Sequence, residues 1–374
     1  MKDFQAGQYI DQGHYRSFQP NPINRAWQLD NMELLQLLGQ ADRELGRLDM
    51  YSEYIPNIDL FIRMNVLKEA TQSSRIEGTQ TNMEEALLEK EDVAPEKRDD
   101  WEEVQNYVAA MNEAMEKLKA LPFSSRLIRD THRTLLQGVR GMNKQPGEFR
   151  QSQNWIGGAT ISDAVFVPPV HTSVVDLISD IEKFVHNDIQ YFPELLKIAL
   201  VHYQFETIHP FLDGNGRVGR LLITLYLVSK KILKKPVLYL SDFFERNRSL
   251  YYDNLMRVRE KNDLPQWFKF FLAGVIETAK NGIATFDNIL KLQKQVEGQL
   301  QTLGSRSANA QKVVNYLYQH PMIDAAMVAK VAEISPASAY KLIADLENFG
   351  ILKEITGGKR GKLYLFDEYL KLFE

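Results

Sequence analysis

The chain of 374 residues contains no cysteine, which excludes disulfide bonds, thiolate metal sites and cysteine nucleophiles. It also lacks an uncharged stretch of about 18 apolar residues, so we expect no membrane-spanning helix. The first five residues show no basic region followed by an apolar core, and the sequence therefore predicts no signal peptide. Together these absences predict a cytoplasmic protein.

An excess of charge of one sign is missing as well. Lys and Arg number 45 and Asp and Glu number 49, so the formal net charge is only −4. No overall positive field would therefore recruit nucleic acid or an anionic membrane. The length predicts two or three domains and is ample for a hydrophobic core.

Apolar residues recur with helical spacing along most of the chain, so the sequence predicts a mainly α-helical protein. Residues 1 to about 30 are the exception, because they are polar and aromatic with two prolines, and we expect an extended arm there. Helices are predicted over 32–48, 58–77, 82–92, 100–119, 125–138, 173–187, 193–208 and from 218 to about 300. The charged connection 92–100 is the best candidate boundary in the first third.

Residues 150–169 differ from their helical surroundings. Short β-prone runs on either side of Gly157 and Gly158 predict an isolated β-hairpin. Pro168 and Pro169 cannot lie in a central strand, because proline has no N–H to donate, so we expect the hairpin to keep an open edge.

The tail from Ser307 has a different pattern again. Helical spacing over 308–319, 324–331 and 336–348 is followed by a Gly-rich ribbon over 351–366, which predicts a winged helix-turn-helix. From Arg306 to Glu374 there are nine Lys or Arg and eight Asp or Glu, and a dedicated DNA reader would be more basic. DNA binding and protein docking both stay open, with protein docking favoured.

The richest stretch of the sequence is a run of twelve residues before an apolar helical pattern. It reads His209-Pro210-Phe211-Leu212-Asp213-Gly214-Asn215-Gly216-Arg217-Val218-Gly219-Arg220. Main-chain N–H groups at the start of the following helix would attract phosphate. Pro210 disfavours the α conformation at His209, so we expect His209 at the end of the preceding helix, facing the loop.

Three plainer interpretations of this run are weaker. Residues 214–219 match G-x-G-x-x-G, but that dinucleotide fingerprint must follow a strand, and residues 195–205 have helical spacing. No Gly-Lys-Ser/Thr ends the loop, so it is not a Walker A motif. A simple glycine turn with paired arginines would not need His209, Asp213 and Asn215 on the same turn.

The run from His209 to Arg220 resembles the signature of Fic-domain proteins, HxFx(D/E)GNGRxxR, at every fixed position. The resemblance covers roughly residues 100–300 and implies a Fic helical core with a small β-hairpin flap. It also implies a protein adenylyltransferase, which moves AMP from ATP to a hydroxyl side chain of a target protein. We therefore divide the chain into an N-terminal helical region (1–98), a Fic core (99–303) and a winged-helix domain (304–374).

The residue types also fit this reaction by their own chemistry. A neutral His209 can accept the proton of an attacking hydroxyl as the catalytic base. Asp213 is a hard oxygen ligand suited to Mg²⁺ that bridges the phosphates of ATP. Gly214 and Gly216 let main-chain N–H groups approach the phosphates without an intervening Cβ.

The other predicted ATP-binding residues lie in and beyond the same run. Asn215 can hydrogen-bond a phosphate oxygen, while Arg217 presents its guanidinium to the leaving pyrophosphate and Arg220 to the γ-phosphate. Two neighbours in the first helical turns and two residues where related proteins line the adenine pocket complete the set: Val218, Gly219, Tyr252 and Asn254.

Residues 73–78, Ser-Ser-Arg-Ile-Glu-Gly, resemble the inhibitory motif (S/T)xxxE(G/N) of self-regulated Fic proteins. Ser73 and Glu77 share a helix face, and Glu77 precedes Gly78 in the last turn, where the helix dipole disfavours an anion. The resemblance implies that Glu77 pairs with Arg220 and keeps the γ-phosphate of ATP from its productive position. A solvated surface glutamate is the alternative.

The resemblance also assigns the hairpin a role. In the family such a flap pairs with the main chain of the target, a form of β-augmentation, and the predicted docking residues are Asn154, Trp155, Ile156 and Gly157. An inert surface hairpin is the alternative. Four other histidines do not have the spacing of metal ligands, and we expect them to be packed or on the surface: His132, His171, His186 and His202.

Two other functions stay open at this stage. One is the reverse enzyme, which removes AMP from a modified protein and uses Glu77 to position a water. The other is a DNA-binding regulator whose Fic core senses a nucleotide, although an intact His209 argues against an inactive core. Besides ATP, the expected partner is an unidentified target protein, self-modification included, and a homodimer stays open.

Overall fold

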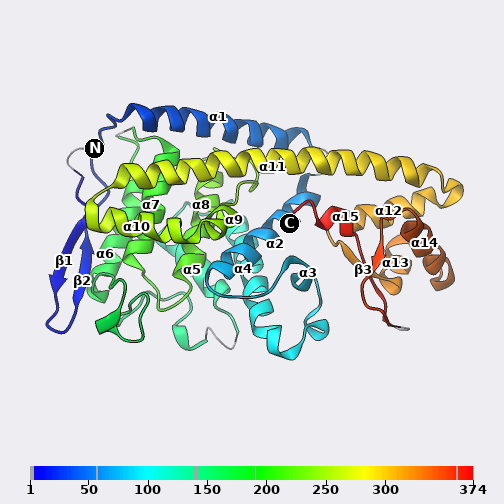
Figure 1. Cartoon of the computed structure of the whole chain (residues 1–374), viewed down its shortest axis with the longest axis horizontal. Helices are drawn as coiled ribbons and strands as arrows, with labels where there is room; N and C mark the ends of the chain where they lie inside the picture. The colour runs from blue at the N-terminus through cyan, green and yellow to red at the C-terminus, as the bar shows by residue number, and fades with distance from the viewer. Residues whose placement is uncertain (1–3, 56–57, 139–141, 190, 359–360, 374) are drawn as a thin grey trace.

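The computed structural model describes residues 4–55, 58–138, 142–189, 191–358 and 361–373, and the fold is mainly α-helical (Figure 1). The mainly helical fold class predicted above is therefore confirmed. No helix of these described residues is both long and apolar enough to cross a membrane.

The N-terminal arm is a small β-hairpin rather than a single extended segment. Strands β1 (Gly7–Asp11) and β2 (Arg16–Pro20) pair antiparallel, with Tyr9 opposite Phe18. Helix α1 (Met32–Tyr54) follows and lies alongside α11 (Leu264–Gln301), and Figure 1 shows these two long helices running together along one side of the molecule.

A helical bundle forms the centre of the protein. Its members are α2 (Ile58–Ile76), α4 (Arg98–Lys117), α5 (Ser125–Leu135), α6 (Val174–Val185), α7 (Glu194–Ile208), α8 (Asn215–Ser229), α9 (Ser241–Arg246) and α10 (Arg248–Lys261). Helices α7 and α8 pack against each other and are buried on nearly every side, as expected for helices that are apolar all round. The loop between them is therefore held by the most deeply buried elements of the bundle.

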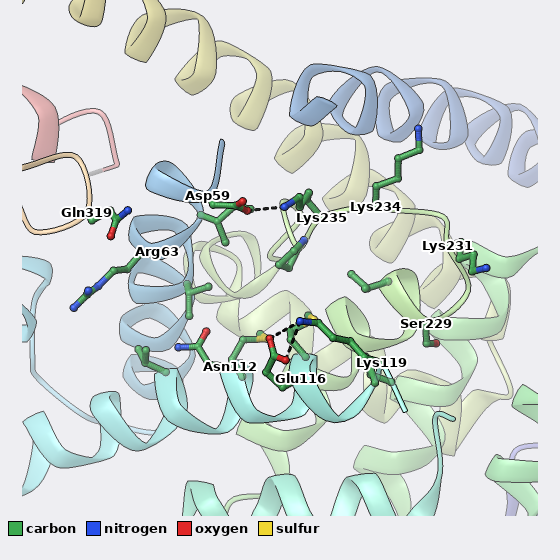
Figure 2. Close-up of a pocket in the computed structure, with 18 residues that line it drawn as sticks. Asp59, Arg63, Asn112, Glu116, Lys119, Ser229, Lys231, Lys234, Lys235 and Gln319 are labelled. Carbon is green, nitrogen blue, oxygen red and sulfur yellow. Dashed lines mark hydrogen bonds and ion pairs between the residues drawn. The ribbon is translucent and has the colours of Figure 1, made fainter. Parts of the chain in front are cut away.

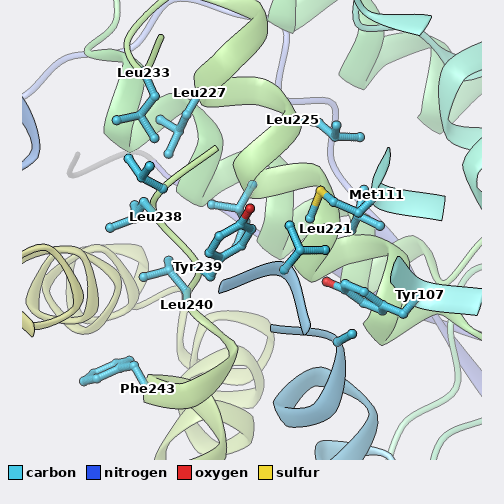
Figure 3. Close-up of a cluster of buried hydrophobic side chains, with 14 of the residues drawn as sticks. Tyr107, Met111, Leu221, Leu225, Leu227, Leu233, Leu238, Tyr239, Leu240 and Phe243 are labelled. Atoms are coloured by element: carbon cyan, nitrogen blue, oxygen red, sulfur yellow. The ribbon is translucent and has the colours of Figure 1, made fainter. Parts of the chain in front are cut away.

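The apolar cluster around the second half of α8 shows how that helix is fixed. Leu221 and Leu225 of α8 lie near Tyr107 and Met111 of α4, and the segment that carries Tyr239 covers the same cluster (Figure 3). All five side chains are buried. Packing of this density leaves little freedom for the first turn of α8 to move.

Two predicted elements are shorter than expected. Helix α3 covers only Met83–Ala86, followed by 3₁₀ turns at Lys90–Asp92 and Pro95–Lys97, because the polar residues after Leu88 offer no apolar face to bury. The predicted hairpin contains a single bridge, between Ile156 and Phe166, instead of two strands.

The sequence predicts an open hairpin edge at Pro168 and Pro169, but this edge is covered in the structure. The N–H of Phe18 in β2 donates to the carbonyl of Val167 at 2.9 Å, so the N-terminal arm covers that edge. Val167 can pair because it lies just before Pro168 and uses its carbonyl as an acceptor. The edge formed by Trp155 and Gly157 pairs with no strand of the described chain.

The tail contains α12 (Ser307–Leu317), β3 (Met322–Asp324), α13 (Ala325–Ala332), α14 (Pro336–Asn348), β4 (Lys353–Glu354), β5 (Leu363–Leu365) and α15 (Asp367–Leu370). The strands lie in the order β3-β5-β4, so a third strand joins the predicted ribbon. This order of elements agrees with a winged helix-turn-helix, which stays a prediction. The basic residues Lys359 and Arg360 of the wing lie outside the described residues.

Candidate functional site

The site is built on the turn between α7 and α8, where His209 adopts a left-handed conformation with φ 49° and ψ 62°. This conformation is uncommon for a residue other than glycine. Two side chains hold the His209 carbonyl, since Arg150 Nε donates to it at 3.0 Å and Asn154 Nδ2 at 3.2 Å. His209 therefore ends α7 and lies in the loop, as the proline after it predicts.

The loop is supported from below by an unexpected residue, His132 of α5. The Gly147 N–H donates to His132 Nδ1 at 2.8 Å, so the proton is on Nε2, which donates to the Asp213 carbonyl at 3.1 Å. The His132 ring also stacks on Phe211, with ring centroids 3.6 Å apart. Burial lowers the pKa of His132 to about 4, so the ring is neutral at physiological pH.

Asn215 bonds to its own loop. The sequence predicts that its amide binds a phosphate oxygen, but the side chain is buried and bonded to the loop itself. Its Oδ1 accepts from the Phe211 N–H at 2.8 Å, and its Nδ2 donates to the Phe211 carbonyl at 2.9 Å. The Asn215 side chain therefore closes the turn, and its contact with ATP stays a prediction.

Arg220 and the end of α2 are in direct contact. Arg220 donates from Nη2 to Glu77 Oε1 at 2.6 Å, from Nε to Ser73 Oγ at 2.8 Å and from Nη2 to the Ser73 carbonyl at 2.9 Å. A Cβ at position 216 would lie 2.3 Å from Glu77 Oε1, so Gly216 is what allows this approach. Gly78, with φ 105°, turns the chain directly after Glu77.

The charges of this contact reinforce one another. Burial alone would raise the pKa of the Glu77 carboxyl, but the charge and hydrogen bond of Arg220, with Arg217 and His209 nearby, hold this pKa below its usual value. Burial opposes the charge of Arg220 too, and Glu77 nevertheless keeps the pKa of Arg220 raised. Both groups are therefore ionised at neutral pH.

Arg217 and Asp213 lie on the outer side of the loop. Arg217 Nη1 donates to Glu103 Oε2 of α4 at 3.0 Å, and Nη2 lies 3.6 Å from Asp213 Oδ1. The Asp213 side chain is 47% exposed, and its Oδ1 accepts the N–H of Gly214 at 2.6 Å. Val218 and Gly219 follow in the buried first turns of α8.

A divalent cation could be held here only in part by the protein. Within the described residues, no group of three or more His, Asp or Glu side chains could ligate a metal. Mg²⁺, however, usually keeps several waters and takes one or two carboxylates plus the phosphates of a bound nucleotide. The half-exposed carboxylate of Asp213 fits that role.

Several buried polar atoms around the loop have no hydrogen-bond partner among the described residues. They include His209 Nδ1 and Arg217 Nε, and Asn254 Oδ1 of α10 is unpartnered as well. Leaving such groups unsatisfied costs about 1–3 kcal/mol each, so two of them in the same run of residues indicate a site that a polar ligand completes. Tyr252 borders the same space and is 39% exposed, and burial and the charge of Glu77 raise its pKa.

His209 has the electrostatic properties of a base. Burial lowers its pKa to about 4, Glu77 opposes the shift, and Arg150 and Arg259 add to it. The imidazole is therefore neutral above pH 5 and can accept a proton.

The predicted docking residues have two different orientations. Asn154 is buried and donates to the carbonyls of His209 and Phe211, so it anchors the hairpin to the loop. Ile156 exchanges both main-chain hydrogen bonds with Phe166, at 2.8 and 3.1 Å. In an antiparallel pair the flanking residues then direct their main-chain groups outward. Trp155, 41% exposed, and Gly157 thus form the free edge.

Sequence reasoning missed three residues that hold the site, namely Arg150, Glu103 and His132. Arg150 is buried and also donates to the carbonyls of Ser152, Pro169 and Ile208, which joins the hairpin to α7. None of the three lies in a motif, and each contacts the loop across a long sequence separation, so no local signal identifies them.

A cleft of about 1040 Å³ lies elsewhere, between α2, α4 and the segment after α8 (Figure 2). Its lining contains none of the predicted site residues. The cations on its rim do not converge, because Lys119 pairs with Glu116 and Lys235 with Asp59, while Lys231 points away from the centre (Figure 2). We therefore place the functional site at the turn between α7 and α8.

Comparison with protein families agrees with this site. A model described as Fic/DOC family N-terminal matches residues 35–116, and the Fic/DOC family model matches residues 122–227. Together the two segments make up half of the chain, and the second contains the whole run from His209 to Arg220.

Curated relatives match a part of their own length. The Aedes aegypti protein adenylyltransferase Fic is 31% identical over 144 residues, which are 38% of this chain and 26% of that protein. A probable protein adenylyltransferase of Aquifex aeolicus is 30% identical over 161 residues, 41% of this chain and 46% of that protein. The matches thus span less than half of either relative.

Solved structures share the fold at low sequence identity. A Fic family protein from Desulfovibrio desulfuricans has a TM-score of 0.58 and 19% identity, covering 91% of this chain and 98% of that one. A Fic-domain-containing signalling protein from Bacteroides thetaiotaomicron has a TM-score of 0.53 and 19% identity, covering 67% and 97%.

Proposed function

The chain belongs to the Fic/DOC family, and we propose that it is a protein adenylyltransferase that moves AMP from ATP to a hydroxyl side chain of a target protein. The observation that carries the proposal is the loop itself. A neutral base, His209, lies beside two buried arginines, Arg217 and Arg220, at the N-terminus of α8, where unsatisfied N–H groups favour phosphate.

The proposed reaction uses each group in turn. His209 accepts the proton of the target hydroxyl while its oxygen attacks the α-phosphorus, and the bond from that phosphorus to the bridging oxygen breaks. Arg217 stabilises the charge that develops on the departing pyrophosphate. Asp213 would hold a Mg²⁺ ion, which neutralises phosphate charge when bound.

We further propose that Glu77 inhibits this reaction. Arg220 is the natural partner of the γ-phosphate, and in this structure its Nη2 already donates to Glu77 and Ser73. Carboxylate and γ-phosphate therefore compete for one guanidinium, and ATP can settle fully only when Glu77 withdraws. Removing Glu77 should consequently favour the productive position of ATP.

The remaining predicted residues fit around the nucleotide and the target. Tyr252 and Asn254 of α10 border the site, and the unpartnered Asn254 Oδ1 can accept a hydrogen bond from the base of ATP. The free edge at Trp155 and Gly157 would pair with an extended segment of the target, which brings its hydroxyl towards His209.

The test is incubation of the wild type and three variants with Mg²⁺ and ATP labelled on the α-phosphate. Glu77→Gly should raise protein labelling at least about tenfold, and the double variant Glu77→Gly/His209→Ala should abolish it. Glu84→Gly, which removes an exposed glutamate of the neighbouring helix α3, is the matched control and should behave as the wild type. Equal labelling by wild type and Glu77→Gly would refute the inhibitory role, and labelling without His209 would refute the mechanism.

The reverse reaction is the second candidate, and one observation favours it. Glu77 is close enough to His209 to perturb its pKa, and a carboxylate beside an imidazole can orient a water molecule. Protein labelled by Glu77→Gly should then lose AMP when purified wild type is added. Retention of the label over hours would exclude this activity.

A further inference from the structure

Glu206 is a buried acid of the site that no step above uses. It lies in the last turn of α7, four residues after His202 and three before His209, so the three side chains share the helix face towards α8. His202 Nδ1 contacts the Gly219 carbonyl at 2.9 Å, which places that face directly on α8. The Glu206 side chain is 7% exposed, and its Oε1 has no partner within the described chain.

Gly219 is what makes room for this carboxyl group. A Cβ at position 219 would lie 2.1 Å from Glu206 Oε1 and 3.2 Å from its Cδ. Glycine in a helix interior is otherwise unfavourable. The contact therefore places a carboxylate next to Arg220, on the side of α8 that faces α7.

Glu206 lies among the charges of three other elements. Arg220 comes from α8, Glu77 from the end of α2 and Arg259 from α10, and the hydroxyls of Tyr251 and Tyr252 complete the surroundings. Arg220 is occupied by Ser73 and Glu77, as described above. Arg259 donates from Nε to Thr207 Oγ1 at 3.1 Å and lies 3.8 Å above the Phe166 ring.

We propose that Glu206 is a positioning residue for the adenylyl transfer proposed above, and that it binds Arg220 when Glu77 releases it. With Glu77 withdrawn, the Arg220 guanidinium loses its carboxylate partner at the end of α2. Two buried acids still act on its charge, Glu206 on α7 and Glu69 on α2, and Glu69 is already bonded to Tyr107 and Ser241. Pairing with Glu206 would keep the guanidinium at the first turn of α8, where the γ-phosphate binds. The inference rests on the proposed function but concerns a different residue.

The direction of the pH effect follows from the charges. Burial raises the pKa of Glu206 to about 7, Arg220 and Arg259 oppose the shift, and Glu77 adds to it. Withdrawal of Glu77 removes a contribution that raises this pKa, so Glu206 ionises more readily once Arg220 is free. The pair of Glu206 and Arg220 is therefore favoured as the pH rises and lost as the pH falls through the pKa of Glu206.

A positioning role and a simple electrostatic effect of Glu206 predict opposite changes in nucleotide affinity. If Glu206 were only an anion near the phosphates, its neutralisation by Gln would strengthen nucleotide binding at pH 8, where it is ionised. A positioning residue gives the opposite result, because a mobile guanidinium must be ordered when the nucleotide binds.

The experiment measures calorimetric binding of an ATP analogue with a methylene group between the α- and β-phosphorus atoms, in the Glu77→Gly background. At pH 8, Glu77→Gly/Glu206→Gln should bind about tenfold more weakly than Glu77→Gly. The difference should shrink as the pH is lowered to 5.5, because protonation of Glu206 removes the pair. Glu260→Gln, an exposed glutamate of α10, is the control and should change neither value.

The outcomes separate the two proposals. Equal or tighter binding by the Glu206→Gln variant at pH 8 would overturn the positioning role while leaving adenylyl transfer intact. A uniform loss of affinity at both pH values, with a lower unfolding temperature, would assign Glu206 a purely structural role and also overturn it. Failure of Glu77→Gly to bind the analogue at any pH would refute the proposed function and this inference together.

Discussion

Two fully buried histidines, His132 and His202, show how single residues make this site sensitive to acid. Burial lowers the pKa of His132 to about 4 and that of His202 to about 3. Each neutral ring is fixed by the hydrogen bonds of both nitrogens, since His202 contacts the Gly219 carbonyl and the Tyr251 hydroxyl at 2.8 Å. Protonation would place an uncompensated charge under the loop between α7 and α8.

We therefore predict that stability falls as the pH drops below 6.5. In the unfolded chain a histidine titrates near 6.5, so the unfolded state binds more protons than the folded state between pH 6.5 and 4. Stability is complete above pH 6.5, and each buried ring should cost about 2 kcal/mol at pH 5. Urea unfolding at pH 7.5 and pH 5 measures the difference.

The controls assign this loss to particular rings. His202→Gln should reduce the pH dependence by about a third, because burial lowers the pKa values of His132 and His209 as well. His171→Gln, at an exposed position, should leave it unchanged. A free energy of unfolding that is the same at pH 7.5 and pH 5 would contradict the argument.

At the residue scale, the sequence predicts which residues belong to the site better than how their side chains are oriented. Arg220 of the signature contacts Glu77 of the inhibitory motif, while the roles of these residues and of His209 stay predictions. The two motifs cannot show that Asn215 bonds to its own loop or that Asn154 faces inward, because a residue type permits both orientations. These choices depend on packing that the motif does not contain.

At the scale of elements, the N-terminal arm and the hairpin form one continuous surface. Phe18 of β2 pairs with Val167, and its ring lies 5.9 Å from the Phe166 ring, over which the Arg259 guanidinium stacks at 3.8 Å. The sequence predicts both segments as extended but cannot predict their pairing, because about 150 residues separate them. The free edge at Trp155 is thus supported from the opposite end of the chain.

We predict that Phe18→Ala loosens the hairpin. Removing a fully buried phenylalanine costs about 3–5 kcal/mol, which the small arm cannot compensate, so β2 should detach from Val167. The amides of Ile156 and Phe166 should then exchange hydrogen at least about tenfold faster, as measured by mass spectrometry of the 150–169 segment. ATP binding should stay unchanged, because the loop is held separately by Arg150.

Tyr9→Ala is the matched control for this experiment. Tyr9 also contacts Phe18 but is 36% exposed on β1, whereas Phe18 is fully buried, so removal of Tyr9 should alter exchange much less. Unchanged protection of Ile156 in Phe18→Ala would show that the hairpin holds its conformation without the arm.

At the scale of the whole molecule, α2 connects the tail to the site. Phe61 near its start lies 5.5 Å from the Tyr318 ring, and Arg63 contacts His320 at 2.8 Å, while Glu77 follows its last turn. The tail therefore contacts the helix that leads to Glu77. This continuity favours a protein-docking or regulatory role for the tail over an independent DNA reader.

The charges of the tail make that preference measurable. Helix α14, which would enter the DNA groove, carries a single cation, Lys341, and the wing residue Lys362 is paired with Glu354 at 2.9 Å. Even with Lys359 and Arg360 of the wing, the tail could neutralise about three phosphates of DNA. In a plot of the logarithm of the DNA-binding constant against the logarithm of the salt concentration, the slope should therefore be no steeper than about −3. Gel shifts between 50 and 200 mM salt measure it. Lys341→Ala should flatten the slope by about one, and a wild-type slope of about −6 or steeper would instead identify a dedicated DNA-binding tail.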